Sequence, residues 1–138
     1  MEADKAAERA LRALIEAEYP DHGIWGEEYG WSREGAAIHW SLDPIDGTRA
    51  FVCGLPSWAV LVGLLEQGGH IGGMIDLPAL GERLIGIDGA AFLNGRETRT
   101  TGCATIAEAR ISTTDPALFD ATHGEGWQRL YRAAPVKR

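Results

Sequence analysis

The stretch Trp40-Ser41-Leu42-Asp43-Pro44-Ile45-Asp46-Gly47-Thr48 places two carboxylates three residues apart at the end of an apolar run. Pro44 restricts the backbone where the strand is expected to end, so Asp43 and Asp46 can converge on one point instead of alternating across a sheet. Two such carboxylates would repel each other, and one would stay protonated unless a divalent cation lay between them. The stretch therefore predicts a metal site directly after a strand.

The chemistry of this stretch favours Mg2+, which binds through a few hard oxygen ligands and completes its shell with water and substrate phosphate. The carbonyl of Ile45 is a candidate for a further ligand. Gly47 and Thr48 offer backbone amides at an expected helix N-terminus, where free donors and the helix dipole favour an anion. An ordinary β-turn has no need of the whole motif, so we favour adjacent metal and phosphate sites over a simple turn.

A second acidic group, Gly26-Glu27-Glu28, precedes Asp43 by one loop and one strand. An antiparallel return of that strand is expected to bring Glu27 beside Asp43. On its own, the Gly-Glu-Glu pattern is a weak signal and is more typical of a solvated loop than of a metal site. It gains weight only from the motif that follows it.

Apolar residues at helical spacing predict an amphipathic helix over residues 3–18, which ends before Pro20 because proline lacks an amide donor. Its charged residues, Glu8 and Arg12 among them, are expected largely on the faces away from the core. The apolar face is expected to carry Ala7, Leu11, Leu14 and Ile15.

Strands are predicted over residues 37–42, 58–65, 70–77, 82–87 and 110–113. The almost continuous apolar run at 58–65 suits a strand buried on both faces. Glycines after Glu66 and the pair Asn94-Gly95 predict hairpin turns, and a last helix is predicted over residues 125–132. A helix, then mostly antiparallel strands, then short helices indicates an α+β layered domain.

The composition bounds the classes of protein to consider. The 138 residues carry a net charge of -7, with no run of Lys or Arg dense enough to follow a nucleic acid or an anionic membrane. Residues 50–65 are apolar but interrupted by glycine and proline, so no membrane span is expected.

The two cysteines, Cys53 and Cys103, are expected to be small buried groups in a reducing compartment. The opening residues lack the order of a secretion signal. One cytoplasmic domain is therefore expected, without nucleic-acid or membrane partners.

The chain also resembles a known family. Gly26-Glu27-Glu28 and the segment from Trp40 to Thr48 are similar to the first two signature motifs of the inositol-monophosphatase family. The continuation from Arg49 to Trp58 resembles the histidinol-phosphatase branch, in which Arg follows the motif threonine. Asn94-Gly95 and Ile111-Ser112-Thr113-Thr114 resemble that branch as well. The resemblance implies the N-terminal half of a layered sugar-phosphatase-like fold, with a largely antiparallel sheet packed by helices.

The resemblance further implies a set of metal ligands. Glu27, Asp43 and the Ile45 carbonyl would hold one Mg2+, and Asp43 and Asp46 would contribute to a second. It implies hydrolysis of a phosphomonoester by in-line attack of a metal-activated water, without a covalent phosphoenzyme. The implied substrate is histidinol phosphate, which would yield histidinol and phosphate in histidine biosynthesis.

Catalytic roles are also implied by the resemblance. Glu27 and Thr48 would orient and help deprotonate the attacking water, and the amides of Gly47 and Thr48 would bind the phosphate. Asp4 and Glu28 are expected just outside the set of ligands. Because relatives are commonly homodimers, self-association is expected, together with a small phosphorylated substrate.

The chain departs from the family pattern at both ends. Family members run to about twice its length, and their second half supplies a Trp-Asp motif that completes the second metal site. We therefore expect residues 1–138 to be the N-terminal metal-binding half of the domain, an incomplete fragment with weak activity of its own. Two alternatives stay open. One is an inositol monophosphatase or another phosphatase for small sugar or nucleotide phosphates; the other is a non-catalytic fragment that binds metal and anions.

Overall fold

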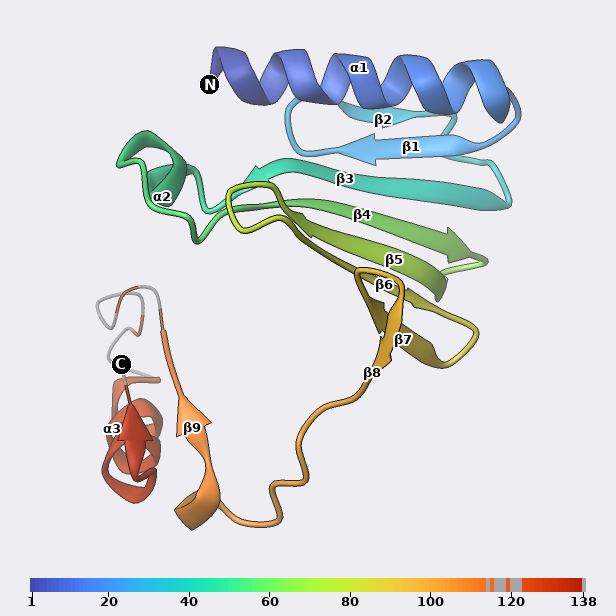
Figure 1. Cartoon of the computed structure of the whole chain (residues 1–138). Helices are drawn as coiled ribbons and strands as arrows, with labels where there is room; N and C mark the ends of the chain where they lie inside the picture. Colours follow the sequence, from blue (N-terminus) through green and yellow to red (C-terminus); the bar gives the residue numbers. More distant parts are fainter. Residues whose placement is uncertain (114, 116–118, 120–122, 138) are drawn as a thin grey trace. The chain divides into compact units, whose positions relative to one another are not determined.

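The computed structural model describes residues 1–113, 115, 119 and 123–137 (Figure 1). Thr114, the end of the segment that resembles the histidinol-phosphatase branch, lies outside the described residues. Within the expected single domain, the chain divides into two compact units, Met1–Arg99 and Thr100–Arg138. Both predicted acidic motifs lie in the first unit.

The first unit contains helices and a sheet of eight strands. Its elements are α1 (Glu2–Glu18), β1 (Gly23–Gly26), β2 (Gly30–Ser32), β3 (Ile38–Asp46), α2 (Thr48–Val52), β4 (Ala59–Glu66), β5 (Gly69–Leu77), β6 (Glu82–Ile87), β7 (Ala90–Leu93) and β8 (Arg96–Thr98). The strands follow the order β2-β1-β3-β4-β5-β6-β7-β8, and every neighbouring pair except β1 and β3 is antiparallel. The predicted α+β fold with a largely antiparallel sheet is confirmed.

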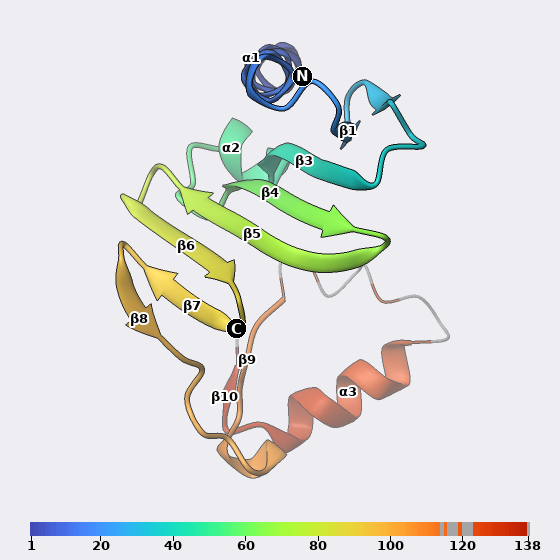
Figure 2. The same cartoon turned by 90° about the vertical axis from the view of Figure 1, so that its right-hand side faces the viewer.

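From β3 to β8 the sheet is a meander, in which each strand pairs with the next along the chain (Figure 2). Tight turns at Gln67-Gly68 and Asn94-Gly95 connect two of these hairpins. All four residues have φ between 48° and 81°, as a two-residue turn with the twist of the strands requires. Both predicted hairpins are confirmed.

The core of the first unit lies between α1 and the sheet. Ile15 of α1 packs with Ile24 of β1 and Leu42 of β3, and partly buried apolar residues surround this cluster. Figure 1 shows α1 lying along the edge of the sheet that contains β1 and β3. The helix therefore packs on the strand that carries Asp43 and Asp46 and on the strand that directly precedes Glu27.

The orientation of α1 differs from the prediction. Leu14, expected in the core, is 69% exposed, whereas Asp4 and Glu8 are 4% and 0% exposed. Residues 4, 8, 11 and 15 form one row along a helix, and this row faces the sheet. Two acidic side chains are buried in that row, so specific partners are needed to stabilise them.

The burial of β4 is also lower than expected. Ala59 is buried, but residues 60–65 are only half-buried, so the strand is not buried on both faces. Its neighbours β3 and β5 satisfy both of its edges. The apolar run predicted a central strand correctly, but the faces of this strand are less buried than the run indicated.

The second unit contains η1 (Ile106–Glu108), β9 (Arg110–Ile111), α3 (Gly124–Ala133) and β10 (Val136–Lys137). β9 is shorter than the predicted strand and pairs in parallel with β10, whereas α3 agrees with the predicted helix. Cys53 and Cys103 are free and exposed, which contradicts their expected burial. None of the helices in the described part of the chain is both long and apolar enough to span a membrane.

Candidate functional site

The two aspartates of the motif lie on β3 itself, not after its end. Asp43 pairs with Leu61 of β4 and Asp46 pairs with Ala59, so β3 advances three residues where β4 advances two. The extra residue makes a β-bulge, which bends a strand and re-aims its side chains. The expected strand end at Pro44 is therefore wrong. The bulge now accounts for how two carboxylates at an odd spacing can escape the alternation of a regular strand.

Glu27 reaches Asp43 through a parallel pair of strands. Gly26 is in register with Leu42, and the amide of Glu27 donates to the Leu42 carbonyl at 3.1 Å. Glu27, the first residue after β1, and Asp43 of β3 are thus neighbours. The expected antiparallel return is wrong, because β2 reverses the chain first and β3 then runs in the same direction as β1.

The environment of the Asp43 carboxyl group disfavours its ionised form. Its Oδ1 atom is buried and accepts no hydrogen bond from the described residues. Burial, the neighbouring Glu27 carboxyl within hydrogen-bonding reach and the charge of Asp46 together raise the pKa of Asp43 from 3.8 to about 6; burial is the largest cause, and the Ile45 backbone opposes it in part. No ion pair joins Asp43 to a positively charged group in the part of the chain that the structure describes, and a bound cation would supply the missing positive charge.

The other groups of the motif lie close to the bulge. The hydroxyl of Thr48 donates to the Ile45 carbonyl at 3.2 Å. Gly47 adopts φ 84° and precedes the short helix α2, in which Thr48 is the first residue. Asp46 and Glu27 are exposed. The candidate ligands and the candidate phosphate-binding amides therefore occupy one end of β3.

Among the residues that the structure describes, no three His, Cys, Asp or Glu side chains are gathered closely enough to hold a metal ion by themselves. The donors present fit a cation that takes few side-chain ligands and fills its shell from carbonyl, water and substrate oxygens, as Mg2+ does. The unsatisfied Oδ1 of Asp43 beside a second carboxyl is the observation that supports this fit. The ligand set Glu27, Asp43, Ile45 and Asp46 stays a prediction.

Asp4 and Glu28 are brought to a shared positive group. Neither carboxylate oxygen of the buried Asp4 accepts a hydrogen bond from the described residues, but Asp4 forms an ion pair with the amine of Met1. The same amine lies 3.5 Å from Oε1 of Glu28. Their place beside the metal ligands stays a prediction.

Two residues that sequence reasoning missed contact the Glu27 loop. Glu8 accepts a hydrogen bond from the amide of Glu28 at 2.8 Å, and Arg12 donates to Glu8 at 2.7 Å. The spacing of Asp4, Glu8 and Arg12 on one row of the helix was the available signal. Charged residues on an amphipathic helix usually face solvent, and the prediction therefore placed Glu8 and Arg12 there.

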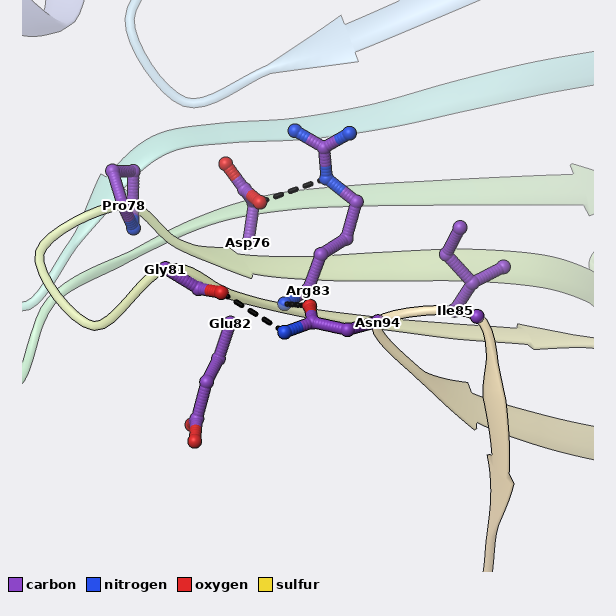
Figure 3. A pocket seen from close by; sticks show the side chains of 8 residues that line it. Asp76, Pro78, Gly81, Glu82, Arg83, Ile85 and Asn94 are labelled. Atoms are coloured by element: carbon purple, nitrogen blue, oxygen red, sulfur yellow. Dashed lines mark hydrogen bonds and ion pairs between the residues drawn. The ribbon is translucent and has the colours of Figure 1, made fainter.

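A separate hollow of about 560 Å³ is lined by residues of β5, of β6 and of the Asn94-Gly95 turn between β7 and β8 (Figure 3). Its polar groups bond to one another: Arg83 donates to Asp76 at 2.8 Å, and the Asn94 side chain bonds to the Arg83 amide and to the Gly81 carbonyl. None of the predicted site residues lines it. It offers space but few uncommitted donors or acceptors.

Comparison with known proteins reveals one family. The model described as "Inositol monophosphatase family" matches residues 1–133. The chain is 41% identical over 131 residues to the bifunctional phosphatase IMPL2, chloroplastic, of Arabidopsis thaliana, covering 93% of this chain and 38% of that protein. It is 41% identical over 113 residues to a histidinol-phosphatase of Chlorobaculum parvum, covering 81% of this chain and 42% of the relative.

The fold is similar to that of solved structures as well. An inositol monophosphatase from Zymomonas mobilis superposes with a TM-score of 0.88 at 37% identity, covering 97% of this chain and 52% of that one. The chain thus spans about half, or less, of the length of the relatives it matches. All predicted site residues lie within the matched segment.

Proposed function

The chain belongs to the inositol monophosphatase family, and on that premise we propose that it forms the metal-binding half of a Mg2+-dependent phosphomonoesterase. One observation carries the proposal: the Glu27 carboxyl lies beside a half-buried Asp43 whose Oδ1 has no hydrogen-bond partner among the described residues. A cation at this position would let both groups ionise. Phosphatases among the relatives make phosphate esters the expected substrates.

Glu27, Asp43, Asp46 and the Ile45 carbonyl would hold the cation. When bound, Mg2+ supplies positive charge that neutralises the carboxylates and polarises the ester. The position of Ile45 in the bulge gives its carbonyl a place near both aspartates along the strand. The protein's contribution is a set of oxygen donors held in place before substrate binds.

Thr48 and Glu27 would act on the attacking water. The Thr48 hydroxyl already donates a hydrogen bond to the Ile45 carbonyl, so its oxygen lone pairs are available to accept a hydrogen bond that orients the attacking water. Glu27 would accept the proton that the water loses. The amides of Gly47 and Thr48 would bind the phosphate, supported by the left-handed conformation of Gly47 before α2.

Histidinol phosphate is the substrate that we favour. Arg49 follows the motif threonine as in the histidinol-phosphatase branch, and a histidinol-phosphatase is among the relatives at 41% identity. Inositol 1-phosphate is the second candidate, favoured by the similarity to the Zymomonas mobilis inositol monophosphatase. The length difference from these relatives keeps a non-catalytic metal- and anion-binding role as a third candidate.

A phosphate-release assay with both substrates tests the proposal, on this chain and on the product of the complete reading frame. We expect Mg2+-dependent release with histidinol phosphate as the better substrate, and loss of release in an Asp43→Asn variant. Turnover of inositol phosphate alone would reverse the choice of substrate. Cation binding without turnover in the complete product would favour the non-catalytic role.

A further inference from the structure

The carboxylate of Glu8 is buried at the junction of α1 with the Glu27 loop. The residue is 0% exposed, and a buried charge is stable only when it is paired and hydrogen-bonded. Two donors meet this need, Nε of Arg12 at 2.7 Å and the amide of Glu28 at 2.8 Å. One of them belongs to α1 and the other to the loop that carries Glu27.

Gly26 makes the close approach of Glu8 possible. A Cβ atom at residue 26 would lie 1.9 Å from Oε1 of Glu8 and 2.3 Å from its Cδ. Every other residue type would therefore displace the carboxylate. The glycine before Glu27 is required here by space and not by an unusual φ angle.

Arg12 extends the contact to the far end of the same loop. Besides Glu8, its guanidinium donates to the carbonyl of Gly30 and to the hydroxyl of Ser32. Its Cζ lies 6.0 Å from the ring centre of Tyr29. The forked geometry of arginine suits such a set of acceptors, whereas lysine could not span it.

The backbone on both sides of the Glu27 side chain is consequently fixed. The amide of Glu27 donates to Leu42 of β3, and the next amide, that of Glu28, donates to Glu8 of α1. Two consecutive amides held by two different elements leave the Glu27 side chain little choice of direction. That direction decides whether its carboxyl meets Asp43.

We propose that Glu8 and Arg12 are a positioning pair, which fixes the Glu27 loop and thereby sets the affinity of the Glu27–Asp43 site for a divalent cation. This inference rests on the proposed function only for the cation. Neither residue need touch the metal or the substrate. Groups that orient ligands in this way typically contribute roughly 10-fold to 100-fold in metal affinity.

The first test needs no metal. Amide hydrogen exchange by NMR is compared between the chain and its Glu8→Gln variant, which keeps the shape of the side chain but removes the charge that holds Arg12. We expect the amides of Glu28 and its loop neighbours to exchange roughly 10-fold faster, while those of β4 and β5 stay unchanged. An Arg12→Lys variant should give a smaller change at the same amides.

The second test is titration with Mn2+, followed by electron paramagnetic resonance at a temperature where circular dichroism shows every variant to be folded. Glu8→Gln should weaken binding by roughly 10-fold. Two controls lie on the same helix. Glu16→Gln makes the same chemical change at an exposed ion pair with Arg33, and Ile15→Ala lowers stability through the core. Both controls should change the Mn2+ affinity less than 2-fold, an allowance for indirect effects of about 0.4 kcal/mol.

The outcomes separate the two proposals. Unchanged exchange of the loop amides in Glu8→Gln overturns the positioning pair, whether or not the chain binds metal. Faster exchange with unchanged Mn2+ affinity overturns it as well. If the unaltered chain binds no Mn2+, the proposed function fails, and the exchange result alone decides whether Glu8 and Arg12 fix the loop. If Ile15→Ala and Glu8→Gln weaken Mn2+ binding equally, Glu8 and Arg12 act only by stabilising the fold, and the positioning role is overturned.

Discussion

Two regions of the same sheet contain acidic side chains, but only one of them pairs its carboxylate with a positive charge. At the hollow formed by β5, β6 and the turn between β7 and β8, Asp76 pairs with Arg83 directly across the strands, and Asn94 bonds to the backbone (Figure 3). At the bulge of β3, Asp43 faces Glu27, and its buried Oδ1 has no partner among the described residues. At the hollow, an ion pair stabilises the carboxylate. At the bulge, two carboxyl groups lie side by side without a positive partner among the described residues, which is unfavourable.

This difference indicates where a ligand belongs. Unfavourable electrostatics persist in a protein only when the surrounding structure enforces them, and such places are often functional sites. The hollow is therefore the weaker candidate, because most of its polar groups already bond to one another. The bulge, where a buried carboxylate oxygen has no hydrogen-bond partner among the described residues, is the stronger one.

The largest effect should come from removing the unmet charge. Asp43→Asn takes away a proposed ligand, and we expect the affinity for Mg2+ or Mn2+ to fall roughly 100-fold or more, the upper end of what supporting residues alone contribute. Calorimetric titration measures it. Asp76→Asn is the matched control from the paired region and should leave the affinity unchanged. Equal effects of the two substitutions would erase the contrast between the regions.

A second prediction concerns the close packing beneath Glu27. Gly26→Ala should lower the free energy of unfolding by about 2 kcal/mol, because the new methyl group collides with Glu8. In a Glu8→Ala background the same substitution should cost only a few tenths of a kcal/mol, since the colliding group is gone. Urea unfolding of the four proteins measures the coupling.

The control for that cycle comes from the meander. A Cβ atom at Gly86 of β6 would meet nothing closer than 4.0 Å, so Gly86→Ala should be neutral or slightly stabilising. If Gly26→Ala costs the same with and without Glu8, the close approach is not the reason for glycine at that position.

A third prediction uses the pH dependence of the metal-free chain. Because the folded-state pKa of Asp43 is raised from 3.8 to about 6, its protonated form stabilises the fold below pH 4, and this contribution is lost as the pH rises through 6. Relative to Asp43→Asn, the unaltered chain should lose about 1 kcal/mol between pH 4 and 7, after allowance for solvent screening. Unfolding curves at several pH values measure it, and saturating Mg2+ should abolish the loss. If the difference in unfolding free energy between the unaltered chain and Asp43→Asn does not vary with pH, the pKa of Asp43 is not raised.

The smallest effect is expected in the paired region. Asp76→Asn removes an ion pair whose arginine is 57% exposed, and exposed pairs contribute roughly 0–1 kcal/mol. We expect a loss below about 0.5 kcal/mol in thermal unfolding. A loss above 2 kcal/mol would show that the hollow is more than a solvated hairpin surface.

Much of the fold follows from local signals in the sequence. The helix that ends before Pro20 and the hairpins at Gln67-Gly68 and Asn94-Gly95 depend on backbone preferences that single residues impose, and all were predicted. The direction in which β3 pairs with β1 depends on how the chain returns after β2. That pairing was predicted wrongly, because no residue near Glu27 encodes it alone.

The candidate site shows the same division. Asp43 and Asp46 were predicted as ligands from residue type and spacing, since oxygen donors are visible in a sequence, and Glu27 was added from the family resemblance; all three stay predictions. The bulge that re-aims the aspartates was not, because it is a property of two paired strands. Glu8 was missed for a related reason: an acidic residue is expected in solvent until its partners across the fold are known.

Because β1 and β3 are parallel, the segment between them, residues 27–37, has its two turns at opposite ends of these strands. The turn after Gly26 lies at the acidic end, where any change in length would shift Glu27, whereas the turn around Gly35 lies at the opposite end of both strands. Gly35 is exposed, and a side chain there would meet no atom within 4 Å. An epitope tag or fluorescent label spliced in at Gly35 would therefore report on this protein without disturbing the carboxylates, and such a position is a natural point of attachment for immobilising it.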